Sequence, residues 1–98
     1  MYENEYQRRL KKKLKERFPG CYILKTDSMD IQGMPDLVLL YGPRWAALEV
    51  KKSKTAPHRP NQDYHVGKLD DMGYAAFIFP ENEEDILNEL SNVFAGSE

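Results

Sequence analysis

The sequence predicts an α/β fold in the order α-β-β-β-α-β-α, with a mixed central sheet flanked by helices. Two observations predict it. Apolar residues recur at helical spacing near both ends of the chain, as in amphipathic helices. Elsewhere, four short apolar runs are bounded by glycine, proline or polar residues, which is the pattern of strands. We expect a single domain over residues 1–98, with a frayed tail at 95–98.

The first third of the chain predicts a helix, a strand and a loop. The helix is defined by an apolar stripe that comprises Tyr2, Tyr6, Leu10, Leu14 and Phe18. Pro19-Gly20 ends this helix. The apolar run 21–24 then predicts a short strand, and the polar run 26–34 predicts a loop.

The middle of the chain predicts a β-hairpin. Its strands are the apolar runs 37–41 and 45–50, and its turn is Gly42-Pro43. If this turn is tight and has no bulge, antiparallel partners have numbers that sum to 85.

That register brings three chemically active side chains to one face of the hairpin. Asp36 lies opposite Glu49, and Lys51 follows Glu49 by two residues on the same strand. Directly opposed residues share a face of a sheet, as do residues two apart on one strand. A slip of one residue would place the two carboxylates on opposite faces instead.

The last third predicts a helix, a strand and a second helix. The first of these helices spans Asn61 to Met72 and ends at Gly73. The very apolar run 74–79 predicts a strand that is buried on both faces. Asn82 is placed to cap the last helix. The buried face of that helix comprises Ile86, Leu87, Leu90, Val93 and Phe94.

The paired carboxylates indicate a site for a divalent cation. Two carboxylates about 5 Å apart at their β-carbons repel each other unless a positive charge neutralises them. Mg²⁺ prefers oxygen ligands and is often held by one or two carboxylates. A lysine beside the ion can orient the attacking water or stabilise charge on a phosphate. The spacing alone also fits an Asp at a strand start and a solvated Glu-Lys pair.

These residues resemble a known signature. Met34-Pro35-Asp36 and Glu49-Val50-Lys51 look like the PD-(D/E)XK motif of a nuclease superfamily, whose restriction-endonuclease-like core has a similar element order. The resemblance narrows to the VRR-NUC family. The further motifs that carry it are Glu5-Tyr6-Gln7, Gly33-Met34-Pro35-Asp36, and Gln62 followed by Leu69 and Gly73.

The resemblance implies a role for each matched residue. It implies metal ligands at Asp36, Glu49, the Val50 backbone carbonyl and Glu5, with Mg²⁺ or Mn²⁺ as the cofactor. Lys51 would act at the nucleophilic water, and Gln62 would support the site or touch substrate from the second helix. Glu3 is the alternative acid on the first helix, and the following Gln7 favours Glu5.

The connection between the last strand of the hairpin and the second helix is polar and basic. Its residues Lys52, Lys54, His58 and Arg59 would bind phosphates beside the scissile bond. A solvated loop is the alternative interpretation, and the sequence does not separate the two.

The resemblance implies a Mg²⁺-dependent DNA endonuclease that hydrolyses phosphodiester bonds. Small members of the family are similar to Holliday-junction resolvases, which implies a homodimer that cuts branched DNA. A twofold dimer would also present two active sites to one junction. The alternatives are a monomeric flap or structure-specific nuclease, and a non-catalytic nucleic-acid-binding module that keeps the fold.

Charge is divided unevenly along the chain. Fourteen basic and eight acidic residues up to Lys68 give a net charge of +6, whereas eight acidic residues from Asp70 onward give −8. The split indicates a cationic surface that suits DNA, although two solvated charged helices would also produce it. With no membrane-spanning run and one cysteine, Cys21, the sequence predicts a cytoplasmic protein (host cytoplasm if phage-encoded).

Overall fold

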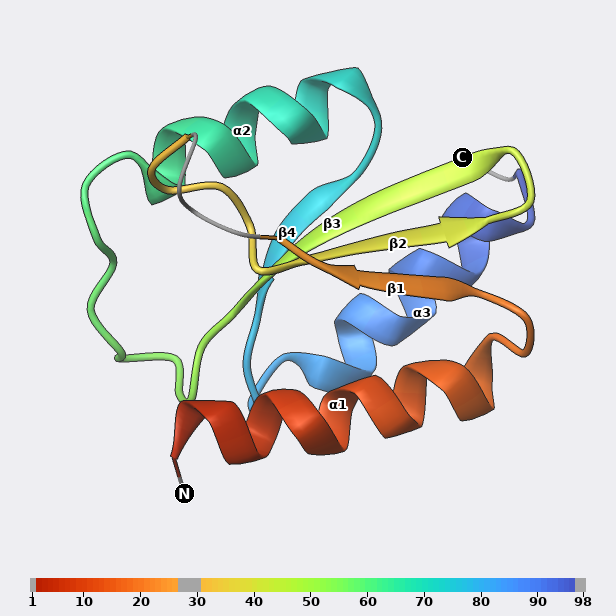
Figure 1. Ribbon diagram of the computed structural model, residues 1–98, viewed down its shortest axis with the longest axis horizontal. Coiled ribbons are helices and arrows are strands. Elements are labelled where there is room, and N and C mark those ends of the chain that lie inside the picture. The colour runs from red at the N-terminus through yellow and green to blue at the C-terminus, as the bar shows by residue number, and fades with distance from the viewer. Residues whose placement is uncertain (1, 27–30, 97–98) are drawn as a thin grey trace.

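Seven elements follow one another in the computed structural model, which describes residues 2–26 and 31–96 (Figure 1). They are α1 (Glu3–Arg17), β1 (Tyr22–Lys25), β2 (Leu37–Tyr41), β3 (Arg44–Val50), α2 (Gln62–Met72), β4 (Ala75–Ile78) and α3 (Glu83–Phe94). The predicted order is therefore confirmed. Part of the predicted loop, 27–30, and part of the predicted tail, 97–98, lie outside the described residues. Among the described helices, none is long and apolar enough to cross a membrane.

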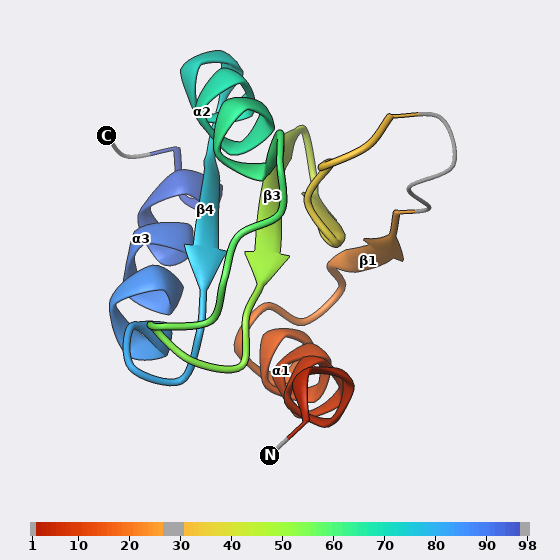
Figure 2. The same cartoon turned by 90° about the vertical axis from the view of Figure 1, so that its left-hand side faces the viewer.

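The four strands form one mixed sheet in the order β1-β2-β3-β4. β2 pairs antiparallel with both β1 and β3, whereas β3 and β4 run parallel (Figure 2). α2 covers one face of this sheet, and α1 and α3 cover the other (Figure 1). The predicted mixed sheet flanked by helices is therefore confirmed.

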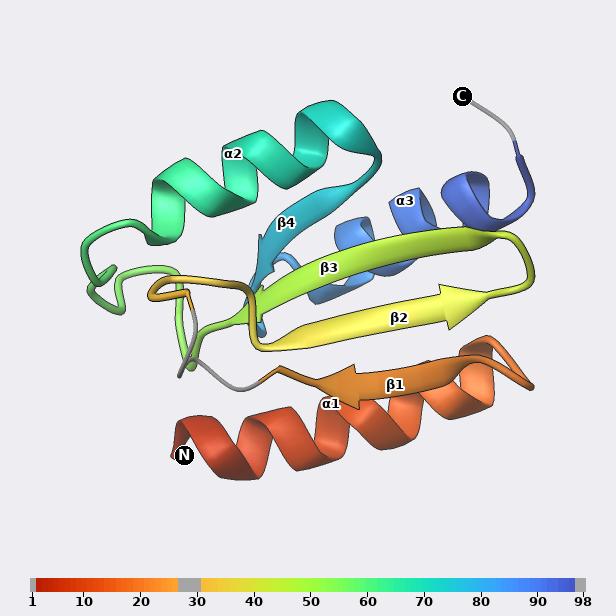
Figure 3. The same cartoon turned by 45° about the horizontal axis from the view of Figure 1, so that its top comes forward.

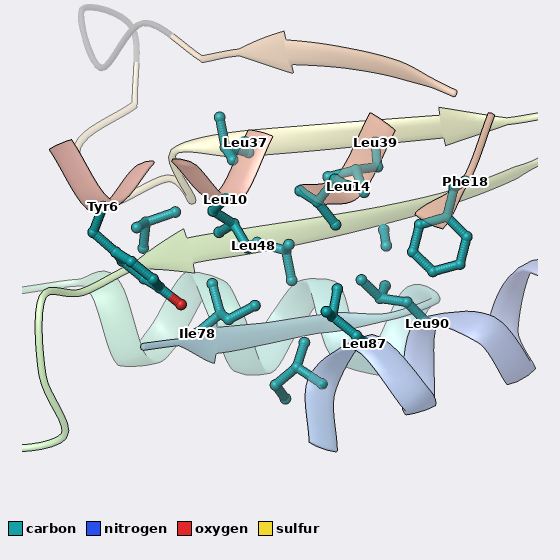
Figure 4. Close-up of a cluster of buried hydrophobic side chains, with 13 residues drawn as sticks. Tyr6, Leu10, Leu14, Phe18, Leu37, Leu39, Leu48, Ile78, Leu87 and Leu90 are labelled. Carbon is teal, nitrogen blue, oxygen red and sulfur yellow. The ribbon is translucent and has the colours of Figure 1, made fainter. Parts of the chain in front are cut away.

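The larger core lies between the sheet and the helices α1 and α3 (Figure 4). Tyr6, Leu10 and Leu14 of the predicted stripe are buried there, each no more than 4% exposed. Tyr2 does not join them and is 77% exposed. The reason is that Tyr2 precedes α1 in extended backbone conformation, so the helical period does not reach it.

The hairpin has the predicted register. Leu37 pairs with Leu48 and Tyr41 pairs with Arg44, so partner numbers sum to 85 throughout. Figure 3 shows β2 and β3 side by side. Gly42 opens the two-residue turn with a φ of +59°, a conformation that glycine adopts without strain. Alternate side chains of β2 and β3 therefore face α2, and this is the side of the sheet on which Glu49 lies.

The start of α3 differs in one detail from the prediction. Asn82 precedes the helix as expected, but its side chain makes no capping hydrogen bond. Instead, Asn82 Oδ1 accepts from the backbone N–H of Phe79, and Nδ2 donates to the carbonyl of Phe77. The side chain closes the turn after β4 rather than the first turn of α3.

Burial of β4 is also less complete than predicted. Ala75 and Ile78 are buried, whereas Ala76 and Phe77 stay partly exposed. The physical reason is the position of β4 at the edge of the described sheet, where one side has no neighbouring strand.

Candidate active site

Asp36 and Glu49 meet where the hairpin strands reach the start of α2. Asp36 directly precedes β2, and its Oδ2 accepts a hydrogen bond of 2.9 Å from the backbone N–H of Val50. This bond fixes the Asp36 carboxylate against the last residue of β3. The negative charge of Asp36 acts on the carboxyl of Glu49, which shows that the two groups lie close together as the register predicted.

The Glu49 carboxyl is buried and only half satisfied. The residue is 3% exposed, and Oε2 accepts a 2.9 Å hydrogen bond from Gln62 Nε2. Oε1 is buried and has no hydrogen-bond partner in the described structure. The pKa of Glu49 is raised to about 8, first by burial, then by the neighbouring Asp36 and to a smaller extent by Glu3, while the positive charge of Lys51 opposes the rise.

Lys51 is held beside this carboxyl by a residue of α2. Its Nζ donates to Gln62 Oε1 at 2.8 Å and to the carbonyl of Pro57 at 3.1 Å, and lies 3.9 Å from Glu49 Oε2. Gln62 Oε1 also accepts from the backbone N–H of Arg59. Gln62 therefore bridges Lys51 and Glu49, and it sets the position of both side chains.

The first helix contributes a different acid from the one that the sequence favoured. Glu5 is exposed, and its Oε1 accepts from the backbone N–H of Tyr2 at 3.4 Å. Glu3 instead accepts from the backbone N–H of Lys52, one residue beyond Lys51, and its charge acts on Glu49. The structure therefore places Glu3, and not Glu5, on the side of α1 that faces Lys52 and Glu49.

Helical geometry explains this placement. A helix turns about 100° per residue, so Glu3 lies on the same face as the buried Gln7 and Leu10, and Glu5 lies nearly opposite. In the sequence, the spacing of four residues between Glu3 and Gln7 indicates that the two share a helix face. The motif Glu5-Tyr6-Gln7 favoured Glu5 instead.

The basic connection between β3 and α2 divides into two parts. The backbone N–H of Lys52 donates to Glu3, and the backbone N–H of Lys54 donates to Glu81. The side chains of both lysines are exposed. His58 stacks on Phe77 with ring centroids 4.2 Å apart. Its Nδ1 lies 2.8 Å from Asp63 Oδ1. His58 thus anchors the connection, whereas the lysine side chains remain available at its surface.

A cavity of about 790 Å³ opens beside Asp36. It is lined by Lys25, Thr26, Gln32, Gly33, Met34, Asp36, Arg59, Pro60 and Gln62. Arg59 was predicted to be near the site, but Lys25 was not. The sequence gives no short turn between β1 and β2, so it does not indicate that the end of β1 lies beside Asp36.

The donor set fits a hard cation that keeps several water ligands. Within residues 2–26 and 31–96, no three His, Cys, Asp or Glu side chains gather closely enough to hold a metal ion by themselves. Mg²⁺ commonly needs only one or two carboxylates and completes its shell with water. The unpartnered Oε1 of Glu49 beside a second carboxylate is the kind of arrangement that such an ion would satisfy.

Solved structures with the same arrangement of elements have the PD-(D/E)XK-like nuclease fold, and this chain shares that fold. One is described as a VRR_NUC domain. It is 24% identical, has a TM-score of 0.62, and the match covers 86% of this chain and 91% of that one. Another is Hjc of Archaeoglobus fulgidus, a Holliday junction resolvase, at 19% identity and a TM-score of 0.54 over 78% of this chain and 67% of that one. No family model and no curated protein matches the sequence.

Proposed function

We propose that the protein is a divalent-metal-dependent DNA endonuclease that hydrolyses phosphodiester bonds at the site of Asp36, Glu49 and Lys51. The observation that carries this proposal is the Glu49 carboxyl, which is buried with one oxygen unpartnered beside a second carboxylate. A buried polar atom without a partner is costly, so its presence favours a functional role. The shared fold with a Holliday junction resolvase supports the same conclusion.

Asp36 and Glu49 would hold Mg²⁺ or Mn²⁺ together with the backbone carbonyl of Val50. Glu3 takes the place of Glu5 as the acid of the first helix, acting directly or through water. When bound, the ion would supply a Lewis acid for the phosphate and lower the pKa of a water molecule.

Lys51 supplies the positive charge of the site. Two of the three Nζ donors are directed at Gln62 and Pro57, which leaves the ammonium fixed beside the carboxyl of Glu49. A lysine held in this way orients the attacking water or stabilises the charge that develops on the phosphate. Gln62 positions Lys51 and does not itself need to touch the reacting atoms.

The substrate in this proposal is DNA, and branched DNA in particular, cut by a homodimer. Lys52, Lys54 and Arg59 would contact backbone phosphates around the site, with His58 anchoring the connection that carries them. The support for branched DNA is the similarity to Hjc. The support for a dimer is the need for two cuts in one junction, which twofold symmetry meets.

A plasmid-cleavage assay tests the activity. Purified wild-type protein is incubated with supercoiled plasmid in Mg²⁺, in Mn²⁺ and in a chelator, beside Lys51→Ala and the surface control Lys68→Ala. We expect cleavage by the wild type and by Lys68→Ala in either metal, and none by Lys51→Ala. Cleavage that persists in the chelator would contradict the metal dependence.

A second experiment tests the substrate. Four-way junctions, flaps and linear duplexes of the same sequence are compared as substrates, and light scattering measures the mass of the protein in solution. We expect a dimer with symmetric cuts in the junction. A monomer that cuts flaps would instead identify a flap nuclease, and binding to every DNA without cleavage would identify a non-catalytic module.

A further inference from the structure

The cavity beside Asp36 is built from three separate segments of the chain. The first segment is the end of β1 with the residue after it, and the second is the stretch before β2. The third is the end of the connection to α2 together with the first residue of that helix. Their lining residues are, in this order, Lys25 and Thr26; Gln32, Gly33, Met34 and Asp36; and Arg59, Pro60 and Gln62. Figures 1 and 3 show the segment before β2 lying against the beginning of α2. The three segments form a concave wall next to the proposed catalytic residues.

Close contacts fix the walls of this cavity. The backbone N–H of Thr26 donates to the carbonyl of Asp36 at 2.8 Å, which ties the end of β1 to the proposed metal ligand. Gly33 approaches α2 so closely that a β-carbon on it would lie 2.8 Å from the backbone carbon of Asn61. The cavity is thus a preformed feature of the fold, as ligand sites commonly are.

The lining has the chemistry of a nucleotide site. Lys25 and Arg59 supply two positive charges, and Met34 and Pro60 supply apolar surface. A phosphate pairs with lysine and arginine, and a sugar or base packs on apolar side chains. The volume of about 790 Å³ lies within the range of roughly 300–1,000 Å³ that is usual for small-ligand sites.

We propose that this cavity binds the nucleotide next to the scissile phosphate, with Lys25 and Arg59 holding the phosphate on the far side of that nucleotide. The proposal rests on the nuclease function, because Asp36 belongs both to the cavity wall and to the proposed metal site. Lys25 is then a substrate-binding residue that acts in binding and not in the chemical step.

Direct binding of a small probe tests the subsite without any need for cleavage. Deoxyadenosine 3′,5′-bisphosphate, which carries one nucleoside between two phosphates, is titrated into ¹⁵N-labelled protein in Ca²⁺. We expect chemical-shift changes at the amides of Thr26, Gly33 and Gln62. Lys25→Gln should weaken binding about tenfold, as loss of one charge-assisted phosphate contact does, and Lys25→Arg should retain it. Lys68→Ala, which is outside the cavity, should bind like the wild type.

Steady-state kinetics on DNA give a second, independent measurement. Lys25→Gln should raise KM about tenfold and leave kcat unchanged, because binding is lost equally from the ground state and the transition state. The subsite is wrong if the probe shifts residues elsewhere, or if Lys25→Gln leaves both probe affinity and KM unchanged while the wild type still cleaves. Probe binding that depends on Lys25 in a protein that cleaves no DNA would overturn the nuclease function and keep the nucleotide subsite.

Discussion

Gln62 Nε2 lies 2.9 Å from Glu49 Oε2, so a residue of α2 satisfies one oxygen of a buried carboxyl and leaves the other oxygen without a donor. The amide oxygen of the same side chain accepts from Lys51. The neutral side chain of Gln62 therefore holds the carboxyl of Glu49 and the ammonium of Lys51 at a fixed separation. Its removal should affect both.

Replacement of Gln62 by alanine should lower kcat by about 10- to 100-fold, the usual effect of losing a residue that orients a metal ligand. KM should change much less than kcat, because the side-chain oxygen and nitrogen of Gln62, although it lines the cavity, bond to Lys51 and Glu49. The variant should also lose roughly 1–3 kcal/mol of stability, since two buried groups lose a partner. Kinetics and thermal unfolding measure the two effects, and an unchanged kcat would contradict the positioning role.

The metal-free protein should become less stable as pH rises from about 5 to 8. The pKa of Glu49 is raised from 4.5 to about 8 in the folded state, so between these values the folded protein binds more protons than the unfolded chain. The free energy of unfolding therefore falls across this window. Glu49→Gln removes the titrating group and should flatten the dependence of Tm on pH. Each kcal/mol of unfolding free energy that the variant no longer loses at high pH corresponds to about 4–8 °C in Tm. A steeper dependence in the variant would contradict this account.

The two acids at the start of α1 provide a matched pair. Both lie in the first turn of the helix, but only Glu3 acts on Glu49. Glu3→Gln should weaken Mg²⁺ binding about tenfold, whereas Glu5→Gln should leave it nearly unchanged. Calorimetric titration of each variant with Mg²⁺ measures the difference. The opposite ranking would restore Glu5 as the acid of the first helix.

A comparison of Gly33 with Gly42 distinguishes the cost of backbone strain from the cost of a steric clash. Gly33 and Gly42 both have positive φ, at +84° and +59°, but only a β-carbon on Gly33 would collide with the backbone of Asn61. Gly42→Ala should cost about 1 kcal/mol from strain alone. Gly33→Ala should cost more, and should also weaken probe binding in the cavity, because α2 must move. Equal losses of stability would show that the contact with Asn61 is unimportant.

The sequence was informative where a short turn fixes the geometry. Because Gly42-Pro43 permits a two-residue turn, the register of the hairpin and the placement of Asp36 opposite Glu49 followed from counting. Lys25 could not be placed in this way, since eleven residues separate it from the start of β2. Long connections leave the pairing of an edge strand undetermined until the tertiary contacts are known.

Two helix starts show where a local pattern does not place a side chain. Glu5 was chosen from a local motif, although the period of α1 places Glu3 on the buried face. Asn82 was assigned to the helix that follows it, but its side chain bonds to the strand that precedes it. A short polar side chain such as that of Asn82 can bond on either side of a helix start, and the sequence alone does not decide between the two.

Cleavage by Lys51→Ala in Mg²⁺ tests the central claim most directly. The ammonium group of Lys51 lies 3.9 Å from Glu49 Oε2 and is oriented by Gln62, so its loss removes the positive charge of the proposed site. Plasmid cleavage should fall below detection in this variant, in a protein whose circular dichroism spectrum matches that of the wild type. A folded Lys51→Ala that cleaves plasmid at the wild-type rate would contradict the proposed active site.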